Sequence, residues 1–239
     1  MNPAIGDNQR PTVAKPGWRL NHRRPGPVAL PRFILMTELR SGTDWTDAIR
    51  RLPPGSAVIV RDPDPRARLA KIKALGPVAA EQGVMLLLSA ERPTRPAGIG
   101  GVHIPETCLS AWRRVDIERA GFSFVSASAH SMAGAVRAVR LGVDAILLSP
   151  VFRTDSHPQA RPLGLRRFEA ILKRIRAPVF ALGGIGVNQI RQINNGGATG
   201  IAGIGLFFEP GFTRKSGGFR AIGVRRAPGR CRAREVLRC

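Results

Sequence analysis

The 239-residue sequence has no tyrosine, only three cysteines and no long hydrophobic run. Cysteines at positions 108, 231 and 239 are too few for a disulfide scaffold and lack the CxxC spacing of metal sites. The longest apolar runs, such as residues 201–208, are too short to cross a bilayer, and no basic segment followed by an apolar stretch opens the chain. We therefore expect a cytoplasmic protein without a membrane partner.

Negative charge is also scarce, because 16 acidic residues stand against 38 basic ones and give a formal net charge of +22. Such an excess can indicate nucleic-acid binding. However, residues 1–30 contribute +4 and residues 213–239 contribute +8 of this charge, and neither end interleaves aromatic with basic side chains as nucleic-acid modules do. Nucleic acid is therefore the weaker explanation of the charge.

The two ends of the chain differ in composition from its middle. Residues 1–30 are rich in proline and arginine without an apolar period, which predicts a disordered basic leader. Residues 213–239 form an Arg- and Gly-rich tail, also predicted to be disordered; a solvated end, an anion-binding tail and a shifted reading frame all fit its composition. Residues 31–212 have the composition of a globular domain.

The middle of the chain alternates short apolar runs with helical patterns. Strands are predicted at 33–37, 57–60, 84–88, 101–104, 123–126, 145–148, 179–182 and 200–204, and helices at 44–51, 65–82, 109–119, 131–141, 165–175 and 188–194. This alternation predicts an α/β fold, a small (β/α)8 TIM barrel. Its third and eighth helical segments should be irregular, because prolines interrupt residues 91–98 and Pro210 stands where the last helix is due.

In such a barrel, function lies in the loops after the strands. The loop VSASAHS, residues 125–131, places small hydroxyl residues and His130 before a helix, which suits an anion. The alternative is that Ser131 only caps the helix and His130 is a loop histidine with partners inside the protein. The next loop carries Arg153, Thr154 and Ser156 and suits phosphate, although an ordinary surface loop has a similar composition.

Glycines follow the last two predicted strands. Gly183 and Gly184 precede a helix, and Gly203 and Gly205 repeat the feature at the end of the eighth strand. Glycine lets the backbone approach a phosphate closely, and barrels often bind phosphate at these two strand ends. The sequence contains no GxSxG, Walker A, HExxH or EF-hand motif.

Taken in order, the motifs SASAHS, VDAILLSPVFRT, PLGL, PVFALGGI and GATGIAGI resemble the thiamine phosphate synthase/TenI family. The close match covers residues 125–206, and FILMTE near the start resembles the family's first strand. The resemblance implies a transferase that joins hydroxymethylpyrimidine diphosphate to thiazole phosphate and releases pyrophosphate with the help of Mg²⁺. It therefore implies phosphorylated small molecules as partners, and it does not indicate an oligomeric state.

The resemblance also assigns roles to residues. Those carried over as catalytic are Arg61, Ser131 and His157, the last standing where the family has a lysine. Those carried over as substrate-binding are His103, Ser128, His130, Thr154, Ser156, Gly183, Gly184, Ile204 and Gly205.

The sequence departs from the family pattern where the metal should bind. Ala90 and Cys108 occupy the places of the two metal carboxylates, so only Glu91 and Glu106 remain as candidate Mg²⁺ ligands. This leaves two functional hypotheses open. The chain is either a synthase, as Pro150 before VF favours, or a TenI-like relative that keeps the phosphate site as a binding or regulatory protein or an isomerase.

Overall fold

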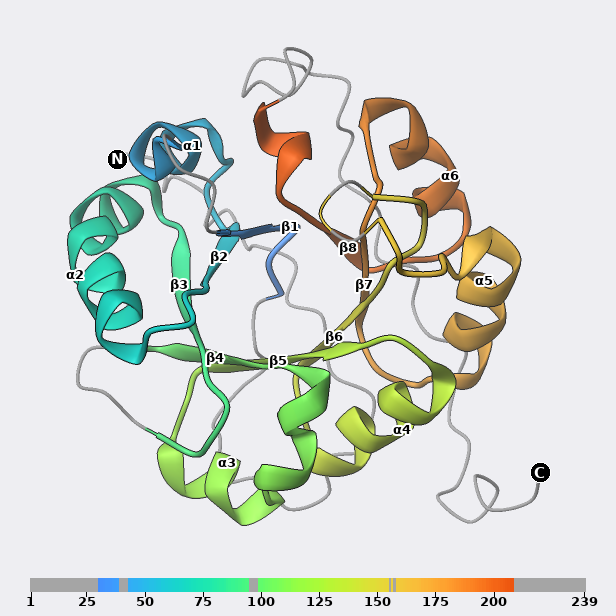
Figure 1. The fold of residues 1–239 in the computed structure, drawn as a ribbon, viewed down its shortest axis with the longest axis horizontal. Helices are drawn as coiled ribbons and strands as arrows, with labels where there is room; N and C mark the ends of the chain where they lie inside the picture. Colours follow the sequence, from blue (N-terminus) through green and yellow to red (C-terminus); the bar gives the residue numbers. More distant parts are fainter. Residues whose placement is uncertain (1–29, 39–42, 95–98, 155, 157, 209–239) are drawn as a thin grey trace, which may run out of the picture.

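The computed structural model describes residues 30–38, 43–94, 99–154, 156 and 158–208. Eight parallel strands pair in sequence order, and β1 pairs with β8 to close a barrel. Helices surround the strands on the outside (Figure 1). The predicted TIM barrel is confirmed. Almost all of the predicted leader and the whole predicted tail lie outside the described residues.

The strands and helices follow the predicted order. The strands are β1 (Phe33–Met36), β2 (Ala57–Val60), β3 (Met85–Ser89), β4 (Gly101–Ile104), β5 (Phe124–Ala129), β6 (Ala145–Leu148), β7 (Val179–Leu182) and β8 (Gly200–Gly203). The α-helices are α1 (Trp45–Arg51), α2 (Pro65–Gln82), α3 (Arg114–Ala120), α4 (Met132–Leu141), α5 (Gly164–Arg174) and α6 (Ile190–Asn195). Short 3₁₀ helices are η1 (Glu106–Ala111), η2 (Val187–Gln189) and η3 (Gly205–Phe208). No helix in the described part of the chain is both long and apolar enough to span a bilayer.

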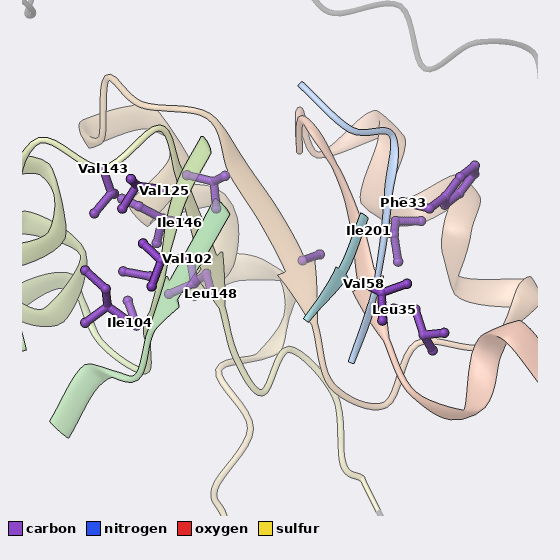
Figure 2. Close-up of a cluster of buried hydrophobic side chains, with 14 of the residues drawn as sticks. Phe33, Leu35, Val58, Val102, Ile104, Val125, Val143, Ile146, Leu148 and Ile201 are labelled. Carbon is purple, nitrogen blue, oxygen red and sulfur yellow. The ribbon is translucent and has the colours of Figure 1, made fainter. Parts of the chain in front are cut away.

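Side chains alternate between the two faces of each strand and so build two apolar cores. One core fills the barrel and includes Ile34, Ile59, Leu87, Phe124 and Phe180. The other lies between strands and helices, and Figure 2 shows part of it, from Phe33 and Leu35 on β1 to Ile146 and Leu148 on β6. This alternation decides which residues of a strand can reach the barrel interior.

Residue types explain most helix ends. Asp64 and Ser131 accept backbone N–H bonds at the starts of α2 and α4, and Gly83 and Gly142 end these helices with φ of 62° and 85°. The bounds of both helices agree with the predicted ranges 65–82 and 131–141 to within one residue. Hydroxyl and carboxylate side chains satisfy free amides at a helix start, and glycine adopts the left-handed conformation without strain.

Three connections differ from a regular barrel or from the prediction. The predicted helix over 109–119 is wrong as a single unit: extended backbone at Trp112 and Arg113 divides it into η1 and α3, and this turn buries the Trp112 side chain. No helix occurs among the described residues between β3 and β4, as the prolines predicted. After β8 the chain forms only η3, whose Phe207 packs edge-on against Phe33 and whose Phe208 packs against Trp45.

Candidate active site at the mouth of the barrel

The mouth of the barrel, meaning the carboxyl ends of the strands and the loops that follow them, contains a polar layer above the apolar interior. His103 on β4 is buried, with its Nδ1 3.0 Å from Ser126 Oγ and its Nε2 2.9 Å from Ser128 Oγ on β5. Resemblance pointed to His103 and Ser128 but not to Ser126. The sequence signal for Ser126 was its spacing of two residues from Ser128, because residues two apart lie on the same face of a strand. This requires the strand to continue past residue 126, and β5 does so.

His103 is neutral in this setting. Burial, with a smaller contribution from the positive charge of Arg61, lowers its pKa to about 3. A neutral imidazole has one N–H donor and one acceptor nitrogen. One serine therefore donates to the ring and the other accepts from it, so the two hydroxyls differ in the hydrogen bonds that they offer. Arg61 thus lies close enough to the polar layer to influence it.

Replacing His103 with glutamine should make the protein less sensitive to acid. The unfolded chain binds a proton at His103 below the ordinary pKa of 6.5, whereas the folded protein does so only near pH 3, so this residue destabilises the fold as the pH falls between these values. Wild type should lose about 1.4 kcal/mol of unfolding free energy more per pH unit than His103→Gln between about pH 6 and 4. Urea unfolding at several pH values measures this; parallel curves would contradict the neutral state of His103.

The loop between β5 and α4 makes internal hydrogen bonds at each of its predicted site residues. His130 Nδ1 lies 2.8 Å from the carbonyl oxygen of Ser149 and 3.2 Å from its hydroxyl, and Ser131 Oγ accepts a bond from Gly134 N at 3.1 Å. Both residues thus have the structural roles foreseen as the alternative to substrate contact. Their contact with substrate stays a prediction.

Glu106, one of the two candidate metal ligands, makes its contacts with residues at and near the start of α4. Its Oε2 accepts a hydrogen bond from His130 N at 2.5 Å, and its Oε1 pairs with Arg137 Nη2 at 2.8 Å. The carboxylate occupies the space that a Cβ on residue 134 would need, so glycine at this position leaves room for the Glu106 side chain. An internal carboxylate therefore already interacts with the amino-terminal end of α4, where the sequence predicted a substrate anion.

Glu91, the other candidate ligand, pairs with Arg68. Its two oxygens lie 2.8 and 3.1 Å from the guanidinium, which holds the pKa of the Glu91 carboxyl below its usual value. Arg68 itself is buried and also donates to the carbonyl oxygens of Asp62 and Ser89. This ion pair joins α2 to the segment after β3, and the bonds to Asp62 connect the same arginine to the loop after β2.

The residues at the mouth do not fit a Mg²⁺ site. Magnesium needs an octahedral set of oxygen ligands, with at least one or two carboxylates free to bind it. Both candidate carboxylates, Glu91 and Glu106, hold arginines instead. No group of three or more His, Cys, Asp or Glu side chains is arranged for a metal in the part of the chain that the structure describes.

The glycine pair after β7 is packed against the loop after β6. Gly183 and Gly184 have φ of 94° and 64°, and a Cβ on Gly184 would overlap the carbonyl oxygen of Arg153 and the Phe152 side chain. Backbone bonds from Val151 N to Leu182 O (2.9 Å) and from Phe152 N to Gly183 O (3.1 Å) hold the two loops together. The structure thus brings the β6 loop, which carries Thr154, next to the glycine pair.

Ile204 and Gly205 lie at the same edge as the glycine pair, because β8 is the neighbour of β7 in the barrel. Gly205 begins η3, and no atom lies within 4 Å of where its Cβ would be. Ser156 reaches across the mouth, with its hydroxyl 3.3 Å from Glu38 Oε2 after β1. His157 falls outside the described residues.

Three arginines give the mouth its positive charge. Arg61 follows β2, and Arg153 and Arg161 lie in the loop between β6 and α5; all three are exposed. None of the three forms an ion pair with a carboxylate among the described residues. The sequence indicated a positively charged mouth. It did not indicate the ion pairs of Arg68 and Arg137, because their carboxylate partners, Glu91 and Glu106, are 23 and 31 residues away in the chain.

Comparisons with known proteins agree on one family. The family model described as thiamine monophosphate synthase matches residues 34–207. The chain is 38% identical over 146 residues to a putative thiamine-phosphate synthase 2 of Aquifex aeolicus, covering 60% of this chain and 72% of the relative. It is 30% identical over 167 residues to the thiamine-phosphate synthase of Methanoculleus marisnigri, covering 67% and 79%.

Solved structures support the fold. A thiamine phosphate pyrophosphorylase from Pyrococcus furiosus superposes with a TM-score of 0.59 at 23% identity, over 74% of this chain and 87% of that one. FabK from Thermotoga maritima, at 16% identity, superposes with a TM-score of 0.56 over 75% and 59%. These likenesses show a shared barrel. Because the family model extends over nearly the whole described barrel, the chain belongs to the thiamine monophosphate synthase family.

Proposed function

We propose that this protein is a transferase of thiamine biosynthesis that joins hydroxymethylpyrimidine diphosphate to thiazole phosphate and releases pyrophosphate. The observation that carries the proposal is the position of two anion-compatible regions at one barrel mouth. Gly183, Gly184 and Gly205 lie at the ends of β7 and β8, and Arg61 lies beside the polar layer of His103. Two phosphorylated substrates that react with each other require two such regions close together.

The reaction places modest demands on the protein. The thiazole nitrogen forms a C–N bond to the pyrimidine methylene carbon while the bond from that carbon to the diphosphate oxygen breaks, and its electron pair leaves with pyrophosphate. This bond exchange itself moves no proton. The protein therefore needs to align two substrates and to stabilise the charge that develops on the leaving group.

The described residues divide these tasks between two sides of the mouth. Backbone amides around Gly184 and Gly205, with the hydroxyls of Thr154 and Ser156, would hold the thiazole phosphate. Arg61 would face the diphosphate, with Ser131 and His157 as further candidate contacts. Ser128 and His103 would contact the pyrimidine from the barrel interior. We assign no step to Mg²⁺, because the carboxylates nearest to this place hold arginines.

A coupled assay of pyrophosphate release tests the proposal. Purified protein with both substrates should release pyrophosphate and form thiamine phosphate. Arg61→Gln should lower kcat/KM by about 100-fold, because a guanidinium that contacts a phosphate contributes roughly 1.5–3 kcal/mol. Arg174→Gln, at an exposed arginine in the last turn of α5, is the control and should leave the rate unchanged. No pyrophosphate release at any metal concentration would refute synthase activity.

The ion pairs of Glu91 and Glu106 favour one second candidate function. A family member without free metal carboxylates could keep the thiazole-phosphate site and lack synthase chemistry, as a TenI-like binding or regulatory protein or an isomerase. Calorimetry with thiazole phosphate, run alongside the coupled assay, separates the two. Tight binding of thiazole phosphate without turnover would support the second candidate.

A further inference from the structure

The carboxylates at the mouth share one property: each one that the structure describes in a loop after a strand is engaged by the chain itself. Asp44 accepts hydrogen bonds from the amides of Thr46 and Asp47, and Asp64 accepts one from the amide of Arg66. Asp62 pairs with Lys71, Glu91 pairs with Arg68, and Glu106 pairs with Arg137 and accepts from the amide of His130. Glu38 accepts a hydrogen bond from the Ser156 hydroxyl. In Asp62, Glu91 and Glu106 both carboxylate oxygens have partners, so recruiting one of these three as a metal ligand would require an existing contact to break.

The basic side chains at the mouth show the opposite pattern. Arg61, Arg153 and Arg161 are exposed and form no ion pair with a carboxylate in the described ranges. Arg61 also lies close enough to the buried His103 for its charge to add to the effect of burial in lowering the His103 pKa, so Arg61 is near the polar layer of the mouth. The mouth therefore offers permanent positive charge, whereas the two candidate Mg²⁺ ligands, Glu91 and Glu106, are already paired with arginines.

We propose that this protein binds the diphosphate group through arginine side chains without needing a divalent cation. The inference rests on the proposed function and deepens it. A guanidinium stays charged at every physiological pH and matches two phosphate oxygens with two parallel N–H donors. Arg61, with Arg153 and Arg161 from the β6 loop, would thus neutralise the diphosphate charge that a bound metal would otherwise balance.

The committed carboxylates have a second consequence. Their arginine partners keep negative charge at the mouth neutralised, so Glu91 and Glu106 repel a diphosphate less than free carboxylates would. Arg68 also fixes the loop after β2 through its bonds to the Asp62 carbonyl. Arg61, the residue before Asp62, is therefore presented from an anchored backbone.

Calorimetric titration of the full chain with inorganic pyrophosphate tests this inference at about physiological ionic strength, where weak contacts with distant exposed charges are largely screened. The Kd measured with EDTA should equal the Kd measured with excess Mg²⁺ within about twofold, or be lower, because Mg²⁺ would only reduce the charge of the ligand. Arg61→Gln should raise the Kd by about 10-fold or more in both buffers.

Arg174→Gln in the last turn of α5 removes the same charge at the end of the barrel opposite the mouth and should not change the Kd. Binding that requires Mg²⁺ would overturn the inference, and so would equal affinities of Arg61→Gln and Arg174→Gln, since the binding would then be diffuse electrostatics. The two proposals fail differently. Metal-free binding at Arg61 without product refutes only the synthase function, whereas product formation combined with pyrophosphate binding that requires Mg²⁺ refutes only this inference.

Discussion

Replacing Gly184 with alanine is expected to weaken binding of thiazole phosphate by about 100-fold or more, the loss typical when a site is misplaced by about 1 Å. The added Cβ would overlap the carbonyl oxygen of Arg153 and the side chain of Phe152, and a carbonyl oxygen fixed in the backbone cannot move aside alone. The β6 loop must therefore shift, and Thr154 shifts with it. The left-handed φ of 64° adds strain for any residue with a Cβ.

Gly197 offers a matched control for this substitution. It also has a positive φ, of 89°, but no atom lies within 4 Å of its Cβ position, and it precedes β8 at the opposite end of the strand from the mouth. Gly197→Ala therefore carries the backbone strain without the clash. Calorimetry with thiazole phosphate should show weak binding for Gly184→Ala and near wild-type binding for Gly197→Ala. Equal binding by both variants would put the phosphate elsewhere.

Replacing Arg68 with alanine is expected to lower the free energy of unfolding by about 3 kcal/mol, because it removes a buried guanidinium with several hydrogen bonds, although its ionic partner Glu91 is half exposed. The guanidinium is buried, and it donates to the carbonyl oxygens of Asp62 and Ser89 as well as to Glu91. Its loss leaves buried carbonyl groups without these donors and opens a space under the loop after β2. Urea unfolding followed by circular dichroism measures the change.

Arg66→Ala is the control for Arg68→Ala, because Arg66 is an exposed arginine in the first turn of the same helix. Arginine and alanine have similar helix propensities, so this variant should stay within about 0.5 kcal/mol of wild type. A loss of similar size in both variants would mean that Arg68 contributes through the helix alone. Arg68→Ala should also weaken pyrophosphate binding, since the backbone that presents Arg61 loses its anchor.

Much of the fold could be predicted from local sequence. Short runs dominated by apolar residues marked most strands, since a strand buried on both faces leaves few polar positions. Ser131, Gly83 and Gly142 marked helix ends through side-chain or backbone chemistry that acts within a few residues. The helix over 109–119 failed because the burial of Trp112, a tertiary contact, outweighed local helical preference.

The candidate site was less predictable. Glycines at the ends of β7 and β8 and the resemblance to the family pointed to the mouth, and β-strand alternation could have added Ser126 to His103 and Ser128. The roles of Glu91 and Glu106 could not be foreseen in this way. A carboxylate in a loop has the same sequence appearance whether it binds a metal or an arginine.

The sequence by itself determined the strand and helix order, the closure into a barrel and the basic character of the mouth, because hydrophobic periodicity, caps and composition act locally or additively. Only the tertiary structure decided which charges are neutralised. Arg68 meets Glu91 and Arg137 meets Glu106 because the closed barrel brings neighbouring strand ends together across 23 and 31 residues. The arginines left unpaired by carboxylates in the described chain, with Arg61 foremost, are therefore a result of chain closure.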